Sequence, residues 1–424
     1  MRVTLLHLQK LLFLLVVIVA WLSSSATSTT VRSQQIEPPL FSIWDARGKE
    51  GFIDASGKIV IAPQFDKVTA FSEGLAAIRI GDKWGYIDRT GKLVVSPRWK
   101  EVYPFSDGVA AIVDGVHGYS YTPLPEEGDG YSATLKACGY IDKSGRYVIE
   151  PSLDRKMTYC PYFQDGIAPV CFEPALKIFF KDFEYAGRCG YLDKSGKWFI
   201  KPQFESASYF SDGLALVRLR QYYDDATKAW LNDFAFINKA GNIVFDLKKY
   251  IEAHPFRECL ARVSNRTGSM NFIDATGQLR FEVNSISSDD FSQGRALVQD
   301  PTTKLFGYVG QDGKWAIAPK YSEAKSFSDG IASVCTERHK CGYINSDGAL
   351  IAEHGGESFR KGLALRHLYT RTIGPTPDFR NIYGYMNRSG KYVWVAPGGE
   401  NFLGEKWWRE NYVGPHVPSS FTRP

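Results

Sequence analysis

The residues with the clearest chemistry in this chain are its seven cysteines, because paired thiols oxidise to disulfides outside reducing compartments. Cys335 directly follows a valine, and Cys341 directly precedes the glycine of a Gly-Tyr-Ile-Asn segment. Cys171 and Cys189 occupy the same two positions around a longer connection. Because the facing ends of a hairpin bring such positions within bonding distance, we predict the disulfides Cys335–Cys341 and Cys171–Cys189.

The remaining cysteines provide one further pair and one single thiol. Cys138 and Cys160 are predicted to form a third disulfide, and Cys259 is predicted to stay unpaired and buried. The alternative for Cys335 and Cys341 is a metal site that includes His339. Their spacing does not match common zinc knuckles, and no fourth ligand lies nearby in the sequence. We therefore predict no metal and no cofactor.

Motifs of known catalytic chemistry are missing from the sequence. It has no Gly-rich phosphate loop, no His-Glu-x-x-His and no Gly-x-Ser-x-Gly. Carboxylates occur as neighbours, as in Asp224-Asp225 and Asp289-Asp290, and neighbouring strand residues point to opposite faces. We therefore predict no catalytic residue and a protein that is not an enzyme. The alternative is a glycan-acting enzyme whose carboxylates come from distant parts of the chain.

Aromatic residues gather in four long segments and form the candidate binding face. Flat rings stack on sugars and anchor protein interfaces, so these segments could bind a protein or glycan ligand. The alternative is that the segments fold back and bury their rings as a satellite core. The candidate residues are Tyr119, Tyr121, Tyr131, Phe180, Tyr185, Tyr222, Tyr223, Trp230 and Tyr369.

A repeated unit must position these segments. The segment Gly85-Tyr86-Ile87-Asp88 occurs in nine related copies, and each has a second glycine six residues after the first position. Gly-Tyr-Ile-Asp predicts a strand, Asp-x-Ser/Thr-Gly a tight turn, and the residues up to Pro97 a returning strand. Phe-Ser-Asp-Gly, as at 105–108, predicts a second turn into a third strand. Each unit is therefore predicted to be a three-stranded antiparallel meander.

The fold class that follows is all-β, with about nine units over residues 40–397. We expect an open, solenoid-like array, with a closed β-propeller-like toroid as the alternative. The chain begins with a third strand at Phe41 to Trp44 and ends with a bare hairpin, so its ends could close a ring or cap a stack. Nearly all variation in unit length falls between the third strand and the next Gly-Tyr-Ile-Asp, which predicts one elaborated face or rim.

The stretch Gly-Asp-Lys-Trp-Gly-Tyr-Ile-Asp at 81–88 and the Phe-Ser-Asp-Gly-Leu-Ala at 210–215 resemble the WG (KWG) repeat proteins, which are common in bacteria. The resemblance covers about residues 40–397. Only Trp84 keeps the tryptophan of the family name, and cysteine or other residues replace it in the other units. The resemblance implies a repeat scaffold, usually of undefined function, and it transfers no catalytic residue.

Residues 1–26 are predicted to be a signal peptide. An uncharged run from Leu11 to Leu22 follows basic residues, and Ser24 and Ala26 suit a cleavage site. Residues 27–39 are a predicted linker, and 398–424 a predicted C-terminal cap or tail. We expect a periplasmic, cell-surface or secreted protein; the alternative is a membrane protein anchored by an uncleaved N-terminal segment.

The charge balance restricts the partners. The net charge of the whole chain is +5, and removal of the signal peptide brings it nearer to neutral, so no nucleic-acid partner is expected. We predict an exported binding or scaffold protein that acts through the insert-bearing face. A purely structural envelope protein is the further alternative, and the oligomeric state stays open.

Overall fold

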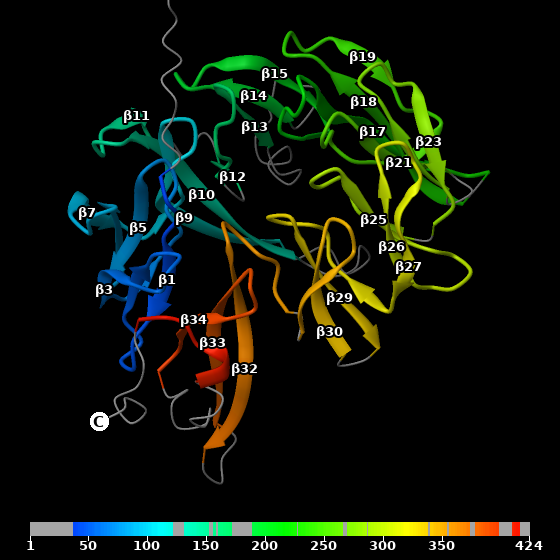
Figure 1. Ribbon diagram of the computed structural model, residues 1–424. Helices are drawn as coiled ribbons and strands as arrows, with labels where there is room; N and C mark the ends of the chain where they lie inside the picture. Colours follow the sequence, from blue (N-terminus) through cyan, green and yellow to red (C-terminus); the bar gives the residue numbers. More distant parts are fainter. Residues whose placement is uncertain are drawn as a thin grey trace, which may run out of the picture. The chain divides into compact units, whose positions relative to one another are not determined.

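The computed structural model consists almost entirely of short antiparallel strands, which Figure 1 shows following one another from β1 to β34. Residues 1–38 and 39–424 are separate units, and the fold below is that of the second. The predicted signal peptide lies outside the described residues, as do 398–408 and 416–424 of the predicted tail. The structure describes residues 37–121, 131–151, 156–157, 160–171, 189–226, 228–265, 269–285, 287–337, 340–353, 356–373, 378–397 and 409–415.

In this described part, the strands form nine antiparallel sheets, here called blades 1 to 9 in chain order. Blade 1 contains β1 (Phe41–Trp44), β2 (Glu50–Ile53) and β3 (Ile59–Phe65). Blade 2 contains β4 (Lys67–Val68), β5 (Leu75–Ile80), β6 (Lys83–Asp88) and β7 (Leu93–Trp99). Blade 3 contains β8 (Glu101–Val102), β9 (Val109–Tyr121), β10 (Tyr131–Asp142), β11 (Tyr147–Ile149) and β12 (Lys156–Met157).

Blades 4 to 6 follow the same pattern. Blade 4 contains β13 (Ile167–Cys171), β14 (Cys189–Asp193) and β15 (Trp198–Phe204). Blade 5 contains β16 (Ser206–Ala207), β17 (Ala215–Asp224), β18 (Ala229–Ile237) and β19 (Ile243–Asp246). Blade 6 contains β20 (Tyr250–Ala253), β21 (Ala261–Asn265), β22 (Met270–Ile273) and β23 (Leu279–Val283).

Blades 7 to 9 complete the series. Blade 7 contains β24 (Ser287–Ser288), β25 (Arg295–Gln299), β26 (Phe306–Gly310) and β27 (Trp315–Tyr321). Blade 8 contains β28 (Glu323–Ala324), β29 (Ile331–Glu337), β30 (Lys340–Asn345) and β31 (Leu350–Glu353). Blade 9 contains β32 (Leu363–Ile373), β33 (Asp378–Asn387) and β34 (Tyr392–Val395).

Each blade joins the end of one sequence unit to the beginning of the next. In blade 2, β5 pairs with β6 and β6 with β7, whereas the strand after the next Phe-Ser-Asp-Gly, β9, belongs to blade 3. The strands of the predicted meander are therefore correct, but their assignment to one sheet is wrong, because the third predicted strand belongs to the next blade. The reason is that the variable connection is itself a hairpin, while Phe-Ser-Asp-Gly leads the chain into the next blade.

The blades form a closed nine-bladed β-propeller, so the predicted open, solenoid-like array is wrong and its alternative is correct. Buried apolar side chains of the described residues fall into nine clusters, each shared by two consecutive blades. The cluster that closes the ring contains Phe41 and Ile43 of blade 1 with Tyr385 and Trp394 of blade 9. Closure leaves only short sheet edges and covers both terminal blades, which an open stack would expose.

One aromatic pair recurs at every junction between blades. The second residue of each Gly-Tyr-Ile-Asp segment is always Tyr or Phe, and at eight junctions it contacts the phenylalanine that leads into the next blade. In the pair Tyr86–Phe105 the ring centroids are 4.9 Å apart. At the closing junction Tyr385 contacts Phe41 at 5.6 Å, and Phe41 lies within β1 itself. The other pairs are Phe52–Phe71, Tyr140–Phe163, Tyr191–Phe210, Phe236–Phe256, Phe272–Phe291, Tyr308–Phe327 and Tyr343–Phe359.

Where this residue is tyrosine, its hydroxyl adds a hydrogen bond between blades. Tyr86 Oη donates to the carbonyl oxygen of Tyr103 at 2.8 Å. Tyr385 Oη donates to the carbonyl of Ser42 at 3.0 Å, so this bond also crosses from the last blade to the first. Burial raises the pKa of Tyr86 and Tyr385, which keeps their hydroxyls protonated and able to donate at neutral pH.

The Phe-Ser-Asp-Gly turns bond to one another along the ring. Their third residue adopts a positive φ, which is 57° at Asp107. The carboxylate of Glu73 accepts the backbone N–H of Gly108 at 3.0 Å, and that of Asp329 accepts the N–H of Gly362 at 2.7 Å. Lys143 reaches the Glu73 carboxylate at 3.3 Å from the turn of another blade. These acidic residues therefore connect blades.

The glycine of Gly-Tyr-Ile-Asp and the following proline depend on each other. Pro97 does not end β7, as the sequence predicted, but lies inside it at a register shift opposite β6. The resulting bulge brings the backbone over Gly85, where an added Cβ would lie 2.4 Å from the carbonyl oxygen of Val95. Proline is tolerated because β7 is an edge strand and needs no further backbone donor there.

The closing hydrogen bond can be tested by Tyr385→Phe, which keeps the ring contact and removes the hydroxyl. We expect the free energy of unfolding to fall by about 1 kcal/mol, because the partly buried Ser42 carbonyl loses its donor. Urea denaturation measures the change. Tyr383→Phe is the control, since that hydroxyl has no hydrogen-bond partner among the described residues, and its effect should stay within about 0.5 kcal/mol. Equal stability of both variants would contradict a role for the Tyr385 hydroxyl in closure.

Candidate functional site

The structure describes the side chains of three of the nine candidate binding residues. These are Tyr222, Tyr223 and Trp230, all on the β17–β18 hairpin. Phe180 and Tyr185 lie outside the described residues. Four others have described backbones in strands of long hairpins, with side chains outside the description: Tyr119, Tyr121, Tyr131 and Tyr369.

The long connections emerge at one end of the strands. In blade 5, Ala215 pairs with Ile237 at the end where the two motif turns lie, and Asp224 pairs with Ala229 at the opposite end. Blade 9 has the same direction, because Leu363 pairs with Asn387 beside its turns. The inserts thus extend away from the turns that connect the blades, and the chain can vary there without breaking those bonds.

Pairing between β17 and β18 sets the two faces of the hairpin. Tyr223 lies opposite Trp230, and Tyr222 opposite Leu231. Because neighbouring residues of a strand point to opposite faces, Tyr222 and Tyr223 are separated. The guanidinium of Arg220 lies 4.8 Å from the ring centre of Tyr222 and forms an ion pair with Asp233, so one face is held by local contacts.

The other face presents two exposed rings. Tyr223 is 46% exposed and Trp230 is 66% exposed. Their ring centres lie 5.5 Å apart in an edge-to-face arrangement, so they support each other while remaining open to solvent. The interpretation of the inserts as a satellite core is therefore wrong for Tyr223 and Trp230, and Tyr222 is half-buried.

Polar groups accompany the exposed rings. Gln221 and Asn232 pair across the strands two residues from Tyr223 and Trp230, which places both amides on the same face. Within the described part of the chain, the Asn232 Oδ1 atom is buried and has no hydrogen-bond partner. The two flat rings can stack on a ligand, and the exposed Gln221 amide beside them can exchange hydrogen bonds with it.

The turn aspartates serve the backbone. The Asp142 carboxylate accepts hydrogen bonds from the Ser144 hydroxyl, from the Ser144 N–H and from the Arg146 N–H, which lower its pKa to about 2. Asn238 accepts the equivalent N–H groups with an amide oxygen. An amide can thus replace the carboxylate, so the role of this position does not require titration.

The cysteines pair as predicted. The structure has the disulfides Cys138–Cys160, Cys171–Cys189 and Cys335–Cys341. The last two join directly opposite residues of a hairpin. Cys259 is unpaired but exposed, so its predicted burial is wrong. It takes the place of the glycine in a Phe-Ser-Asp-Gly turn, with a φ of 67°, and this turn faces solvent.

The repeat seen in the sequence corresponds to a known family. A model of the WG-containing repeat matches residues 51–84, 84–115, 139–173, 190–223 and 306–337. The chain contains WG-type repeats. Each matched segment begins in the hairpin of one blade and continues into the next blade, as the aromatic pairs require.

Solved structures resemble this WG-repeat propeller at low identity. A crystal structure of the eukaryotic initiation factor is 10% identical, with a TM-score of 0.55 over 85% of this chain and 95% of that chain. BamB from Moraxella catarrhalis is 12% identical, with a TM-score of 0.35 over 77% and 90%. No curated protein matches. The first likeness supports the fold alone.

One finding bears on where the protein works. Three disulfides favour an oxidising environment outside the cytoplasm. In the part of the chain that the structure describes, no helix has the length and apolar character to cross a membrane.

A cavity between blades 8 and 9 was not predicted from the sequence. It has a volume of about 530 Å³, and its lining includes Arg366, Lys391 and Tyr392. The available signal was Arg366 itself, which stands where the other repeats have Ile or Val.

The disulfide at the base of the second insert should stabilise the fold. Because Cys171 and Cys189 are 18 residues apart, their joint replacement by serine should lower the free energy of unfolding by about 3 kcal/mol. Chemical denaturation without reductant measures this. Cys259→Ser is the control and should change stability by less than about 0.5 kcal/mol. An unchanged midpoint for the double variant would contradict a stabilising disulfide.

Proposed function

We propose that this WG-repeat propeller is an exported, non-enzymatic binding module that holds a glycan on the β17–β18 hairpin. The observation that carries the proposal is the exposed pair Tyr223 and Trp230. An exposed apolar ring contributes little to the stability of the fold, and it gains favourable contacts when a ligand covers it. Their exposure therefore suits recognition better than stability.

The neighbouring amides favour a glycan over a wholly apolar partner. Gln221 and Asn232 place amide groups beside the rings, and the exposed Gln221 side chain can donate and accept hydrogen bonds. Sugar hydroxyls supply complementary groups, while sugar C–H faces lie flat on aromatic rings. The alternative ligand of the hairpin is a protein, and the binding assay below distinguishes it from a glycan.

The charges of the hairpin favour binding over hydrolysis. Asp233 forms an ion pair with Arg220, and Asp225 lies 3.3 Å from Lys228 near the tip. Glycoside hydrolysis requires two carboxylates that face one bond. The Asp233 carboxylate is instead paired with Arg220, which supports a module that binds its glycan without cleaving it.

Binding is tested with Trp230→Ala. We expect at least an approximately tenfold loss of affinity for insoluble peptidoglycan or cellulose in a sedimentation assay, because an exposed anchor ring is removed. The thermal midpoint should not change. Trp315→Ala is the matched control, since Trp315 is 41% exposed on β27 of another blade.

The same assay distinguishes the alternatives. Equal binding by Trp230→Ala, Trp315→Ala and the unchanged protein would place the glycan elsewhere. Absence of polysaccharide binding by all three would reject the glycan and leave a protein ligand for the hairpin.

Export is tested at the N-terminus. Cleavage after Ala26 predicts that the mature protein from its native host begins at Thr27. N-terminal sequencing or mass spectrometry of the intact protein measures this. A mature, membrane-free protein that still begins at Met1 would contradict the predicted signal peptide.

A further inference from the structure

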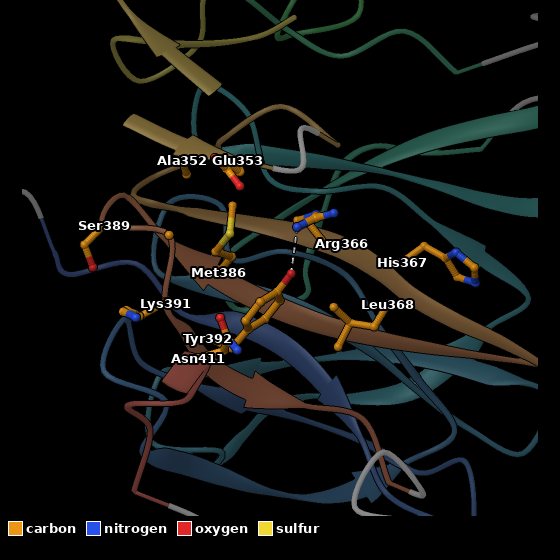
Figure 2. A pocket seen from close by; sticks show the side chains of 11 residues that line it. Ala352, Glu353, Arg366, His367, Leu368, Met386, Ser389, Lys391, Tyr392 and Asn411 are labelled. Carbon is orange, nitrogen blue, oxygen red and sulfur yellow. Dashed lines mark hydrogen bonds between the residues drawn. The ribbon is translucent and has the colours of Figure 1, made fainter. Parts of the chain in front are cut away.

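The cavity between blades 8 and 9 lies where the repeat departs from its own pattern. Blade 8 contributes Ala352 and Glu353, blade 9 contributes Arg366 and Tyr392, and the tail contributes Asn411. Figure 2 shows Arg366 and Tyr392 joined by a hydrogen bond, with Met386 beside them. This cavity is separate from the β17–β18 hairpin, which belongs to blade 5.

The first departure is Ala352. In every blade, one residue of the outer strand pairs with the aromatic residue of Gly-Tyr-Ile-Asp. This residue is large in the other eight blades and packs towards the next blade. In blade 7, for example, the Ile317 side chain would lie 3.3 Å from a Cβ added to Gly348 of blade 8. Only blade 8 has alanine. The eight large residues are Ile61, Val95, Ile149, Ile200, Phe245, Phe281, Ile317 and Trp394.

The second departure is Arg366. It pairs with Gly384, and the residue in this register is isoleucine or valine in all eight other blades. Every one of those residues is buried. An arginine therefore replaces an apolar core residue at the junction that Ala352 opens. The apolar equivalents are Ile43, Ile78, Ile112, Val170, Val217, Val263, Val298 and Val334.

The environment of Arg366 leaves its charge uncompensated. Its side chain is half-buried, and Nη1 donates to the Tyr392 hydroxyl at 2.8 Å. Among the described residues, no carboxylate forms an ion pair with it. A guanidinium has five N–H donors, and a cation withdrawn from water without an anion is costly. Packing alone would favour isoleucine or valine, as in the other blades.

The remaining lining gives the cavity two kinds of surface. Lys391 adds a second cation and donates to the carbonyl of Glu410 in the tail. Met386, Leu368 and Ala352 provide an apolar side. Glu353 is the one carboxylate among the lining residues and is exposed. An anion bound at Arg366 therefore has an apolar surface beside it.

We propose that this cavity binds a small organic anion whose carboxylate or phosphate group pairs with Arg366 and whose apolar part lies against Met386 and Leu368. The anion compensates the guanidinium charge and accepts its remaining N–H groups, for which bidentate geometry suits both carboxylate and phosphate. Ala352 provides the volume, and Tyr392 orients the guanidinium. The site does not depend on the glycan function of the hairpin.

Isothermal titration calorimetry of the full chain with three six-carbon probes tests this. We expect hexanoate or hexyl phosphate to bind, and hexylammonium not to bind. The comparison of the two anions shows which group the site takes. Failure of both anions to bind, or equal binding of hexylammonium, overturns the proposal.

Variants assign the binding to Arg366. Arg366→Gln should weaken binding of the preferred anion at least about tenfold, because a charged pair is lost. The double variant Arg366→Ile with Ala352→Ile restores the residue types of the other junctions and should fill the cavity. It should keep or raise the thermal midpoint and bind no anion. Arg280→Gln removes an exposed arginine of blade 6 and should leave the affinity unchanged. Unchanged affinity in folded Arg366→Gln overturns the proposal.

Discussion

The aromatic pair between consecutive blades is the contact on which the rest of the propeller depends. The Tyr or Phe of each Gly-Tyr-Ile-Asp segment is almost fully buried and packs on the phenylalanine that begins the next blade, as Tyr86 does on Phe105. Short sheets cannot bury a core by themselves, so each blade needs a neighbour on both sides. A ninth pair, Tyr385 with Phe41, gives the junction between the last and first blades an aromatic contact as well, although Phe41 lies within β1 and not in a Phe-Ser-Asp-Gly turn.

This division between blades explains where the chain can change. The two motif turns and the aromatic pairs link neighbouring blades. The variable connection, which joins the strand after Phe-Ser-Asp-Gly to the Gly-Tyr-Ile-Asp strand, contains none of these linking residues. The β17–β18 hairpin extends there and exposes Trp230. Arg366 represents a different kind of change, because it replaces a core residue within the repeat itself. In this repeat scaffold, the candidate binding sites therefore lie where one repeat is longer than its neighbours or carries a residue of different chemistry.

Much of the fold could be predicted from the sequence, because the repeated turns require specific residues. The strands, the number of units and the three disulfides follow from Gly, Asp and Cys at fixed spacing. Closure could not be predicted, because the contact between Phe41 and Tyr385 joins residues more than 340 positions apart and no local signal favours a ring over a stack. The predicted phase of the blades was wrong because the variable connection is itself a hairpin, whereas Phe-Ser-Asp-Gly leads the chain into the next blade. Exposure of Trp230 and the cavity at Arg366 depend on which neighbours are present in space.

Small-angle X-ray scattering of the mature protein tests the central claim of a closed ring most directly. For a compact domain of the size of residues 39–424, the expected radius of gyration is about 21 Å, with a pair-distance distribution that has one main peak. Closure through the Phe41–Tyr385 junction predicts this value. A clearly larger radius with a long tail in the distribution, as an open arc of nine blades would give, would contradict it.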